Sequence, residues 1–297
     1  MLRYLLLSWA LQLMLTDTLD YYTNYYYYYS ACLDGFNQLP GKHELPEFRK
    51  TIVDYFEACS QLSTRIAALM AKGMGRPMDD AFVQELREKH TSYLRLNYYP
   101  PCNPQQQEEE EDNEENAAAT TLGISPHRDA GFLTVLLQDD DCHSLQALKD
   151  DKWISASPIP GAFTINTGDM AQVWSNGRYK APLHRVLANP HKRRYSAPFF
   201  YNPGYDTFVK PVLKQEQEEV KYEDVLWGYY RAVRFAGDMT DLGVEIQANH
   251  FDKSNKIPSP HLARQKAFYE GKWSNVPFDV ERYRQLLKDY PDSSCEQ

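Results

Sequence analysis

Apolar residues recur at steps of three and four between about residues 46 and 73, a period that predicts a long amphipathic helix with one buried face. Two nearby glycines are expected to end it. Asp79 or Asp80 then provides the N-cap of a shorter helix that runs to about residue 89. Residues 46–92 are therefore expected to form a helical scaffold without a catalytic role.

The pattern changes after residue 92. Short apolar stretches separated by Gly, Pro and Asp follow one another to about residue 205, and this spacing indicates a sandwich or barrel. An eight-stranded, double-sheet jelly roll, or double-stranded β-helix, fits the pattern. The expected fold class is mixed but mainly β, with a jelly-roll core over residues 93–205 flanked by α-helices. The expected strands are 93–99, 133–138, 144–148, 163–167, 183–187 and 195–201.

The C-terminal part, residues 206–297, is expected to be a region of helices and loops. Its apolar periodicity predicts helices over residues 222–235 and 280–288. The segment between them is rich in Asn, Pro and Lys and gives no clear pattern.

Two segments are expected to stand outside the folded core. Residues 1–45 contain an apolar stretch too short to span a bilayer, which needs about 20 residues, and a run with seven tyrosines in nine positions. A signal peptide is the weaker alternative, because no small-residue cleavage site follows the apolar stretch. We expect an atypical, poorly ordered segment here. Residues 105–121 are polar and mostly acidic, and predict a disordered, solvated insert.

Composition and charge narrow the functional classes. The chain of 297 residues is 42% hydrophobic, enough to build a sizeable core. Its formal charge of −9 comes largely from the seven acids in residues 108–115, so the rest is nearly neutral and no nucleic-acid surface is expected. Five scattered cysteines without a C-x-x-C motif favour a reducing compartment. We expect a cytoplasmic monomer that binds neither nucleic acid nor membrane.

Two clusters of polar residues provide the candidate chemistry. His127 and Asp129 lie two positions apart, so on an extended strand both side chains point to one side and can reach one ion. With His184 they give two imidazoles and one carboxylate, the ligand set of non-haem Fe(II) oxygenases, which leaves coordination positions open. Arg194 and Ser196 share the two-residue spacing and offer a cation and a hydroxyl to a small acid.

A short His-x-Asp match is more often structural than metal-binding, so the flanking sequence decides. GFLTVLLQ follows at residues 131–138, while NTGDM (166–170) and WSNGRYK (174–180) lead into the second histidine. With these motifs in this order, residues 46–205 resemble the 2-oxoglutarate/Fe(II)-dependent dioxygenases. The likeness is to the plant-type soluble branch, which includes flavonoid, gibberellin and auxin oxidases. Isopenicillin N synthase and aminocyclopropane-carboxylate oxidase belong to the same superfamily.

The resemblance implies the double-stranded β-helix fold and an oxidoreductase that uses Fe(II), O2 and 2-oxoglutarate, with ascorbate as an expected aid. Arg194 would pair through its planar fork with the distal carboxylate of 2-oxoglutarate, and Ser196 would donate a hydrogen bond to the same group. Asn97 and Tyr99 occupy positions that touch the co-substrate in the family. The expected metal ligands are His127, Asp129 and His184.

The implied reaction decarboxylates 2-oxoglutarate to succinate and CO2 and hydroxylates or desaturates a small molecule. Four residues beside the ligand strands, Phe132, Leu145, Phe199 and Tyr201, are tentative members of the substrate pocket. Strand alternation directs Arg128 away from the cavity; an inward Arg128 would instead favour an acidic substrate.

Two alternatives stay open. The first is an Fe(II) oxidase of the same fold that uses no 2-oxoglutarate. The second is a non-catalytic binding protein on a decayed dioxygenase scaffold, which is suggested only by the missing N-terminal strand and helix of the family.

Overall fold

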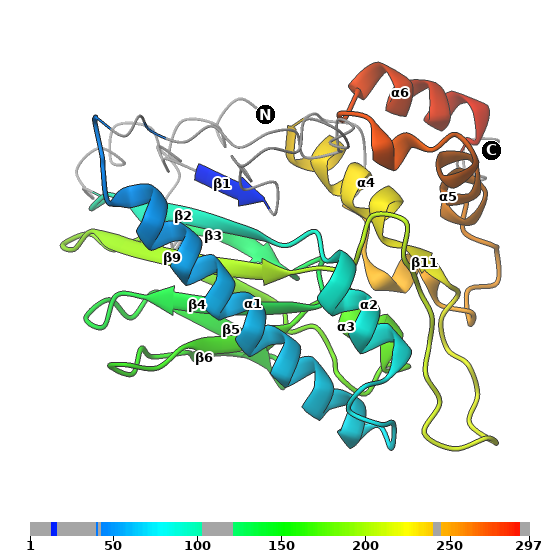
Figure 1. Ribbon diagram of the computed structural model, residues 1–297, viewed down its shortest axis with the longest axis horizontal. Helices are drawn as coiled ribbons and strands as arrows, with labels where there is room; N and C mark the ends of the chain where they lie inside the picture. Colours follow the sequence, from blue (N-terminus) through cyan, green and yellow to red (C-terminus); the bar gives the residue numbers. More distant parts are fainter. Residues whose placement is uncertain (1–12, 17–39, 41–42, 103–120, 240–244, 292–297) are drawn as a thin grey trace, which may run out of the picture.

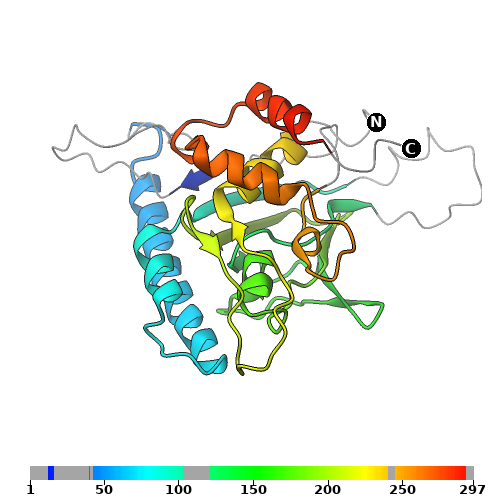
Figure 2. The same ribbon diagram turned by 90° about the vertical axis from the view of Figure 1, so that its right-hand side faces the viewer.

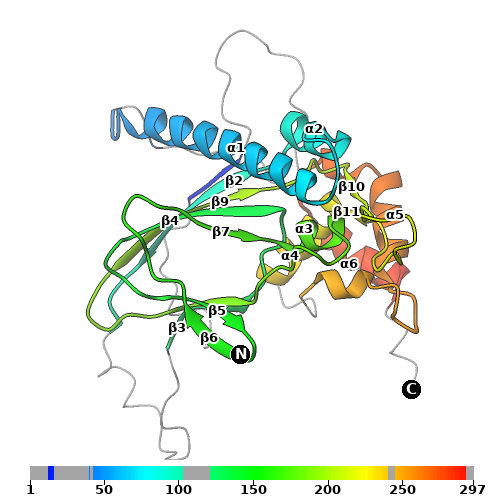
Figure 3. The ribbon, with the colours of Figure 1, turned by 90° about the horizontal axis from the view of Figure 1, so that it is seen from below.

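The computed structural model describes residues 13–16, 40, 43–102, 121–239 and 245–291 (Figure 1). Two antiparallel sheets face each other (Figure 3). The five-stranded sheet has the order β1-β2-β9-β4-β7, and the four-stranded sheet has the order β3-β8-β5-β6. In chain order the strands are β1 (Leu13–Thr16), β2 (Tyr93–Tyr99), β3 (Leu122–His127), β4 (Leu133–Gln138), β5 (Leu145–Lys149), β6 (Lys152–Ser155), β7 (Thr164–Thr167), β8 (His184–Leu187) and β9 (Arg194–Tyr201).

Helices cover the outside of this double sheet. The long helix α1 lies across the outer face of the five-stranded sheet, and the C-terminal helices gather at one end of the barrel (Figures 2 and 3). The remaining elements are α1 (Phe48–Gly73), α2 (Ala81–Lys89), α3 (Asp169–Trp174), β10 (Phe208–Val209), β11 (Val225–Leu226), α4 (Trp227–Met239), the 3-10 helices η4 (Ala248–Phe251) and η5 (Trp273–Asn275), α5 (His261–Glu270) and α6 (Val280–Asp289).

The expected jelly roll flanked by helices is confirmed, and most expected elements have counterparts. Strand β2 has the expected bounds, and Asp80, one of the two expected caps, accepts a hydrogen bond from the backbone N–H of Phe82 at 3.0 Å. Several elements had no counterpart in the expectation, among them β3, β6, α3 and α5. Strands β3 and β6 are mostly exposed or half-buried, α3 is a single short helix, and α5 lacks a clean apolar stripe, so none gives a strong periodic signal.

The N-terminal segment differs in part from the expectation. Residues 13–16 form the edge strand β1, which pairs with β2 from Leu13 opposite Leu96 to Thr16 opposite Tyr93. Residues 13–16 therefore belong to the sheet. They include the end of the apolar stretch, which is too short to cross a bilayer but long enough for one strand. Most of residues 1–45, and all of the 105–121 insert except Thr121, lie outside the described residues. Among the described residues, no helix has the length and apolar character to cross a membrane.

The main core lies between the five-stranded sheet and helix α1 and continues among the C-terminal helices. Phe56 of α1 meets Phe199 of β9 edge to face, with ring centroids 5.0 Å apart. Because side chains alternate along a strand, the residues between those packed on α1 point to the other face, toward the second sheet. There a small cluster of Leu136, Leu145 and Val186 is found. The barrel interior is therefore only partly filled, and the functional site lies there.

The burial of His90 makes the stability of the fold depend on pH. It packs against Phe56 and Tyr201, and burial lowers the pKa of His90 from 6.5 to about 4. The unfolded chain would take up this proton below 6.5, so stability present at neutral pH is lost as the pH falls toward 4. We expect His90→Leu to reduce this acid destabilisation by about 2 kcal/mol.

Urea unfolding of the metal-free protein at pH 7 and pH 4.5 measures the effect. His191→Leu, at an exposed histidine, is the matched control. An equal loss of stability in wild type and His90→Leu would contradict the assignment.

Candidate metal and 2-oxo acid site

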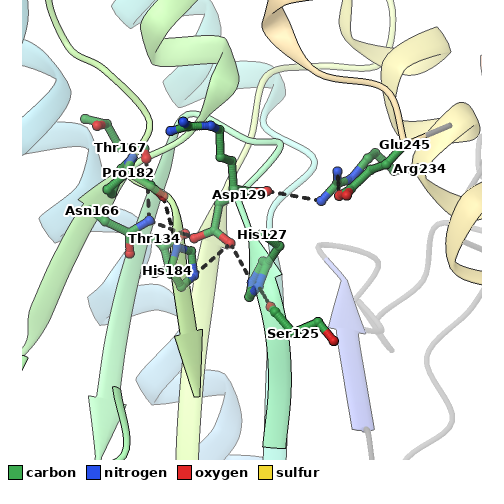
Figure 4. A network of polar contacts seen from close by, with 11 residues as sticks. Ser125, His127, Asp129, Thr134, Asn166, Thr167, Pro182, His184, Arg234 and Glu245 are labelled. Atoms are coloured by element: carbon green, nitrogen blue, oxygen red, sulfur yellow. Dashed lines mark hydrogen bonds and ion pairs between the residues drawn. The ribbon is translucent and has the colours of Figure 1, made fainter. Parts of the chain in front are cut away.

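The three expected metal ligands converge at one end of the barrel interior. His127 ends β3 and His184 begins β8, and the two face each other in the register of these paired strands. Asp129 follows two residues after His127. The Nε2 atoms of both histidines lie 3.7 Å from Oδ1 of Asp129, and one ligand atom from each residue lies within 4.8 Å of the others. Figure 4 shows these side chains pointing toward one another.

Hydrogen bonds fix the Asp129 carboxylate so that one oxygen is left for a ligand. Its Oδ2 accepts from Thr134 at 2.6 Å and from Asn166 at 2.7 Å. Its Oδ1 faces the two histidines. Burial alone would raise the pKa of Asp129, but the neighbouring histidines and these two donors hold it below its ordinary value. The carboxylate is therefore ionised and aimed at the space between the imidazoles.

Each histidine ring is oriented by a carbonyl two residues earlier in the chain. His127 Nδ1 lies 2.8 Å from the Ser125 carbonyl, and His184 Nδ1 lies 3.2 Å from the Pro182 carbonyl. A carbonyl can only accept, so Nδ1 carries the proton and Nε2 keeps its lone pair. Burial, helped by the nearby His184, lowers the pKa of His127 and favours its neutral, metal-binding form.

The backbone after the first histidine is held by the start of α3. The N–H of Asp169 donates to the Asp129 carbonyl at 2.8 Å. A Cβ at Gly168 would stand 2.2 Å from the Gly131 carbonyl oxygen and 2.7 Å from that of Asp129. Only glycine allows this approach of two backbones, so the Gly168-Asp169 turn is part of the support of the ligand loop, residues 127–131.

The expected co-substrate residues form two cross-strand pairs. Asn97 of β2 lies opposite Ser196 of β9, and Tyr99 lies opposite Arg194. The Ser196 hydroxyl accepts from Asn97 at 3.2 Å and from Arg194 at 3.2 Å, while the Arg194 guanidinium lies 5.1 Å from the centre of the Tyr99 ring. These four residues and the three metal ligands line the same cavity.

Arg194 is a buried cation that has no carboxylate beside it among the residues that the structure describes. It is 2% exposed, and it donates to Ser196 and, at 3.0 Å, to Gln138. Its Nε and the Oδ1 of Asn97 have no hydrogen-bond partner among the described residues. A buried arginine held only by neutral groups is suited to an incoming carboxylate, which its planar fork can meet with two hydrogen bonds.

The tentative substrate pocket needs correction. Of its four residues, Leu145 lines the cavity, but Phe132, Phe199 and Tyr201 are buried in the main core outside it. The alternation of β9 explains two of these errors. Arg194 and Ser196 point inward, so Pro198 and Phe200 do as well, and the residues between them pack toward α1.

Sequence reasoning missed several residues of the site, among them four polar ones. Thr134 and Asn166 orient Asp129, Gln138 holds Arg194, and Arg95 lines the cavity. The alternation through Asn97 and Tyr99 would have placed Arg95 inside. Nothing local marks Gln138 or Asn166, because their roles depend on strand pairings that the sequence does not show.

Arg128 points away from the cavity, as expected from alternation. Its guanidinium donates to the Ala181 carbonyl instead.

The residues fit Fe(II) better than a structural ion. Two imidazoles and one carboxylate on one side of a shared point leave the opposite side open to the cavity, whereas structural zinc sites are closed by four protein ligands. Two-His-one-carboxylate geometry inside a jelly roll defines the class of non-haem Fe(II) oxygenases.

Comparison with known proteins agrees. Residues 90–203 match the sequence profile described as the 2OG-Fe(II) oxygenase superfamily. This part of the chain, which contains the whole site, belongs to that superfamily, and the resemblance in the sequence is confirmed.

The similar proteins include plant enzymes. Jasmonate-induced oxygenase 2 of Arabidopsis thaliana is 38% identical over 182 residues, which cover 61% of this chain and 44% of the relative. 1-Aminocyclopropane-1-carboxylate oxidase 5 of Arabidopsis thaliana is 34% identical over 194 residues, with 62% and 59% covered. The crystal structure of JOX2 in complex with 2OG, Fe and JA has a TM-score of 0.55 and 35% identity, and covers 65% of this chain and 56% of that one. The chain thus spans about half the length of the relatives that it matches.

The hydrogen bond from Thr134 to Asp129 provides a test of the metal site. Thr134→Val keeps the shape of the side chain but removes one donor to Oδ2, so the carboxylate is less firmly aimed. We expect the affinity for Fe(II) or Co(II) to fall about 10-fold, as is typical for outer-shell partners of a metal ligand.

Anaerobic metal titration of the purified protein measures this effect. Thr207→Val is the matched control, because Thr207 is also buried but donates to Glu85, away from the ligands. Equal affinities in Thr134→Val and wild type would show that this bond does not orient the ligand.

Proposed function

We propose that this protein is an Fe(II)- and 2-oxoglutarate-dependent dioxygenase that hydroxylates or desaturates a small molecule. The observation on which the proposal rests is one cavity with two ends. Three metal-ligating side chains gather at one end, and a buried arginine that has no carboxylate partner in the described part of the chain lines the same cavity. A dicarboxylate with an adjacent keto group can engage both ends at once.

His127, Asp129 and His184 would hold the iron. Bound there, Fe(II) would supply open positions where O2 and a chelating 2-oxo acid react, and the overall reaction yields succinate, CO2 and an oxidised substrate. Arg194 would bind the distal carboxylate with Ser196, and this anchoring would direct the keto acid end of 2-oxoglutarate toward the metal ligands. The apolar side chains of Leu136, Leu145 and Val186 would keep water from the reacting centre.

The cavity favours a small substrate over a polymer. Its volume is about 220 Å³, and it lies between two sheets rather than along an open groove. Similarity to plant enzymes named for gibberellin and 1-aminocyclopropane-1-carboxylate supports a metabolite as the substrate.

Anaerobic reconstitution tests the cofactor assignment. Addition of 2-oxoglutarate to the Fe(II)-loaded protein should produce a weak visible charge-transfer band. We expect His184→Ala to abolish the band, because a metal ligand is lost, and Arg194→Ala to weaken it, because the distal carboxylate loses its anchor.

His143→Ala and Arg193→Ala are matched controls, since both residues are exposed and Arg193 is the neighbour of Arg194. Bound iron without a band would favour an oxidase that uses no 2-oxoglutarate. Absence of iron binding in folded protein would favour the binding-protein alternative.

Charge in the cavity favours an acidic substrate. Its charged lining residues are Arg95, Arg194 and Asp129, and the Nε of Arg95 is buried with no hydrogen-bond partner among the described residues. The net positive charge of Fe(II), Arg194 and Asp129 taken together would be balanced by the two carboxylates of 2-oxoglutarate. The charge of Arg95 then remains, and a substrate carboxylate would neutralise it.

We therefore expect Arg95→Met to lower kcat/KM for a carboxylic acid substrate about 10- to 100-fold, the value of one charge-assisted hydrogen bond. Substrate-independent succinate release should be unchanged, because Arg95 does not hold the co-substrate. A screen of carboxylic acids and their methyl esters by succinate release measures both. Equal turnover of acid and ester by the wild type would contradict an anionic substrate.

A further inference from the structure

Helix α4 lies outside the segment that matches the family profile, yet it contacts the ligand loop. Arg234 of α4 donates from its guanidinium to the carbonyl oxygen of Arg128, at 3.1 Å. Arg128 is the residue between His127 and Asp129. Figure 4 shows Arg234 reaching the backbone of this loop beside Asp129.

Arg234 is held in place by a second set of acceptors. Its side chain is 10% exposed and forms an ion pair with Glu245, and it also lies 3.5 Å from the Ile246 carbonyl. A guanidinium fixed on one carboxylate and two carbonyls loses little further conformational entropy when it holds the loop, because its planar fork is already oriented. Glu245 thus supports Arg234, and Arg234 supports the loop.

Arg128, whose carbonyl accepts this hydrogen bond, lies where it can affect the carboxylate ligand and a histidine ligand of the metal. This carbonyl belongs to the peptide that joins Arg128 to Asp129, so its direction sets the direction in which Asp129 leaves the loop. The Arg128 side chain donates in turn to the carbonyl of Ala181. Ala181 precedes Pro182, whose carbonyl orients the ring of His184. Arg128 therefore connects α4 to the loop that carries His127 and Asp129, and also to the segment that precedes His184.

We propose that Arg234 is a positioning residue of the metal centre, by which helix α4 fixes the peptide that joins Arg128 to Asp129. The inference rests on the metal site of the proposed function. It assigns a role to a region that is neither in the jelly roll nor in the cavity lining: α4 and the segment that contains Glu245 form part of the support of the metal site.

The test measures metal affinity and stability separately. Co(II), whose visible absorption reports ligand number and does not require O2, is titrated into the full-length metal-free protein, and the melting temperature of the metal-free protein is recorded. We expect Arg234→Met to weaken Co(II) binding about 10-fold, in the range found for residues that orient metal ligands. Arg234→Lys, which keeps a donor but loses the fork, should recover part of this affinity.

Arg178→Met is the matched control. Arg178 also forms an ion pair, with Glu218 at 2.6 Å, but the ligand loop is not among its partners. It should lower the melting temperature of the metal-free protein without changing the affinity for Co(II).

Glu245→Gln keeps the inference testable if Arg234→Met does not fold. It leaves Arg234 in place but removes the charge that holds it, so a smaller loss of Co(II) affinity is expected. Unchanged affinity in folded Arg234→Met, or in Glu245→Gln if only that variant folds, would overturn the inference while leaving the metal site intact. No Co(II) binding by the wild type would instead overturn the metal site itself.

Discussion

The carboxylate of Asp129 is the point at which the two sheets of the barrel meet in the site. Its Oδ1 faces histidines carried by β3 and β8 of the four-stranded sheet, while its Oδ2 is bound by Thr134 of β4 and Asn166 of β7 in the five-stranded sheet. A buried, ionised carboxylate must be satisfied by hydrogen bonds or charge, because desolvation is costly. This requirement fixes the distance between the sheets at one end of the barrel and so determines where a metal can lie.

The outer supports of the site follow from the same constraint. The ligand loop cannot move without carrying the carboxylate away from its donors, so its backbone is held by α3 and by Arg234 of α4. At the other wall, the pairing of β2 with β9 places Asn97 opposite Ser196 and Tyr99 opposite Arg194. The metal end is thus built from strand ends and the loop after β3, whereas the anion end is built from facing residues of the neighbouring strands β2 and β9. The two ends differ in what holds them, although they share one cavity.

Much of this could be predicted from the sequence, for a definable reason. His127 and Asp129, like Arg194 and Ser196, are separated by two residues, and the alternation of a strand makes such pairs share a face whatever the tertiary structure. The same rule applied along β9 would have replaced Phe199 and Tyr201 by Pro198 and Phe200 in the pocket, and along β2 it would have added Arg95. Gln138, Asn166 and Arg234 could not be found in this way. Each acts on a residue at least 37 positions away, and the contact depends on pairing and helix docking that leave no local pattern.

The distribution of the site over two sheets has a mechanical consequence. Arg194 and Ser196 belong to one sheet, and His127 and His184 belong to the other, so a co-substrate that binds at both ends joins the two sheets across the hollow part of the barrel. The bound ligand then connects the two sheets in a region where few side chains do so. Binding of such a small molecule would raise the free energy of unfolding of the whole double sheet, since a ligand that binds only the folded form stabilises it in proportion to the logarithm of its concentration. The stability of the barrel would thus follow the supply of the co-substrate.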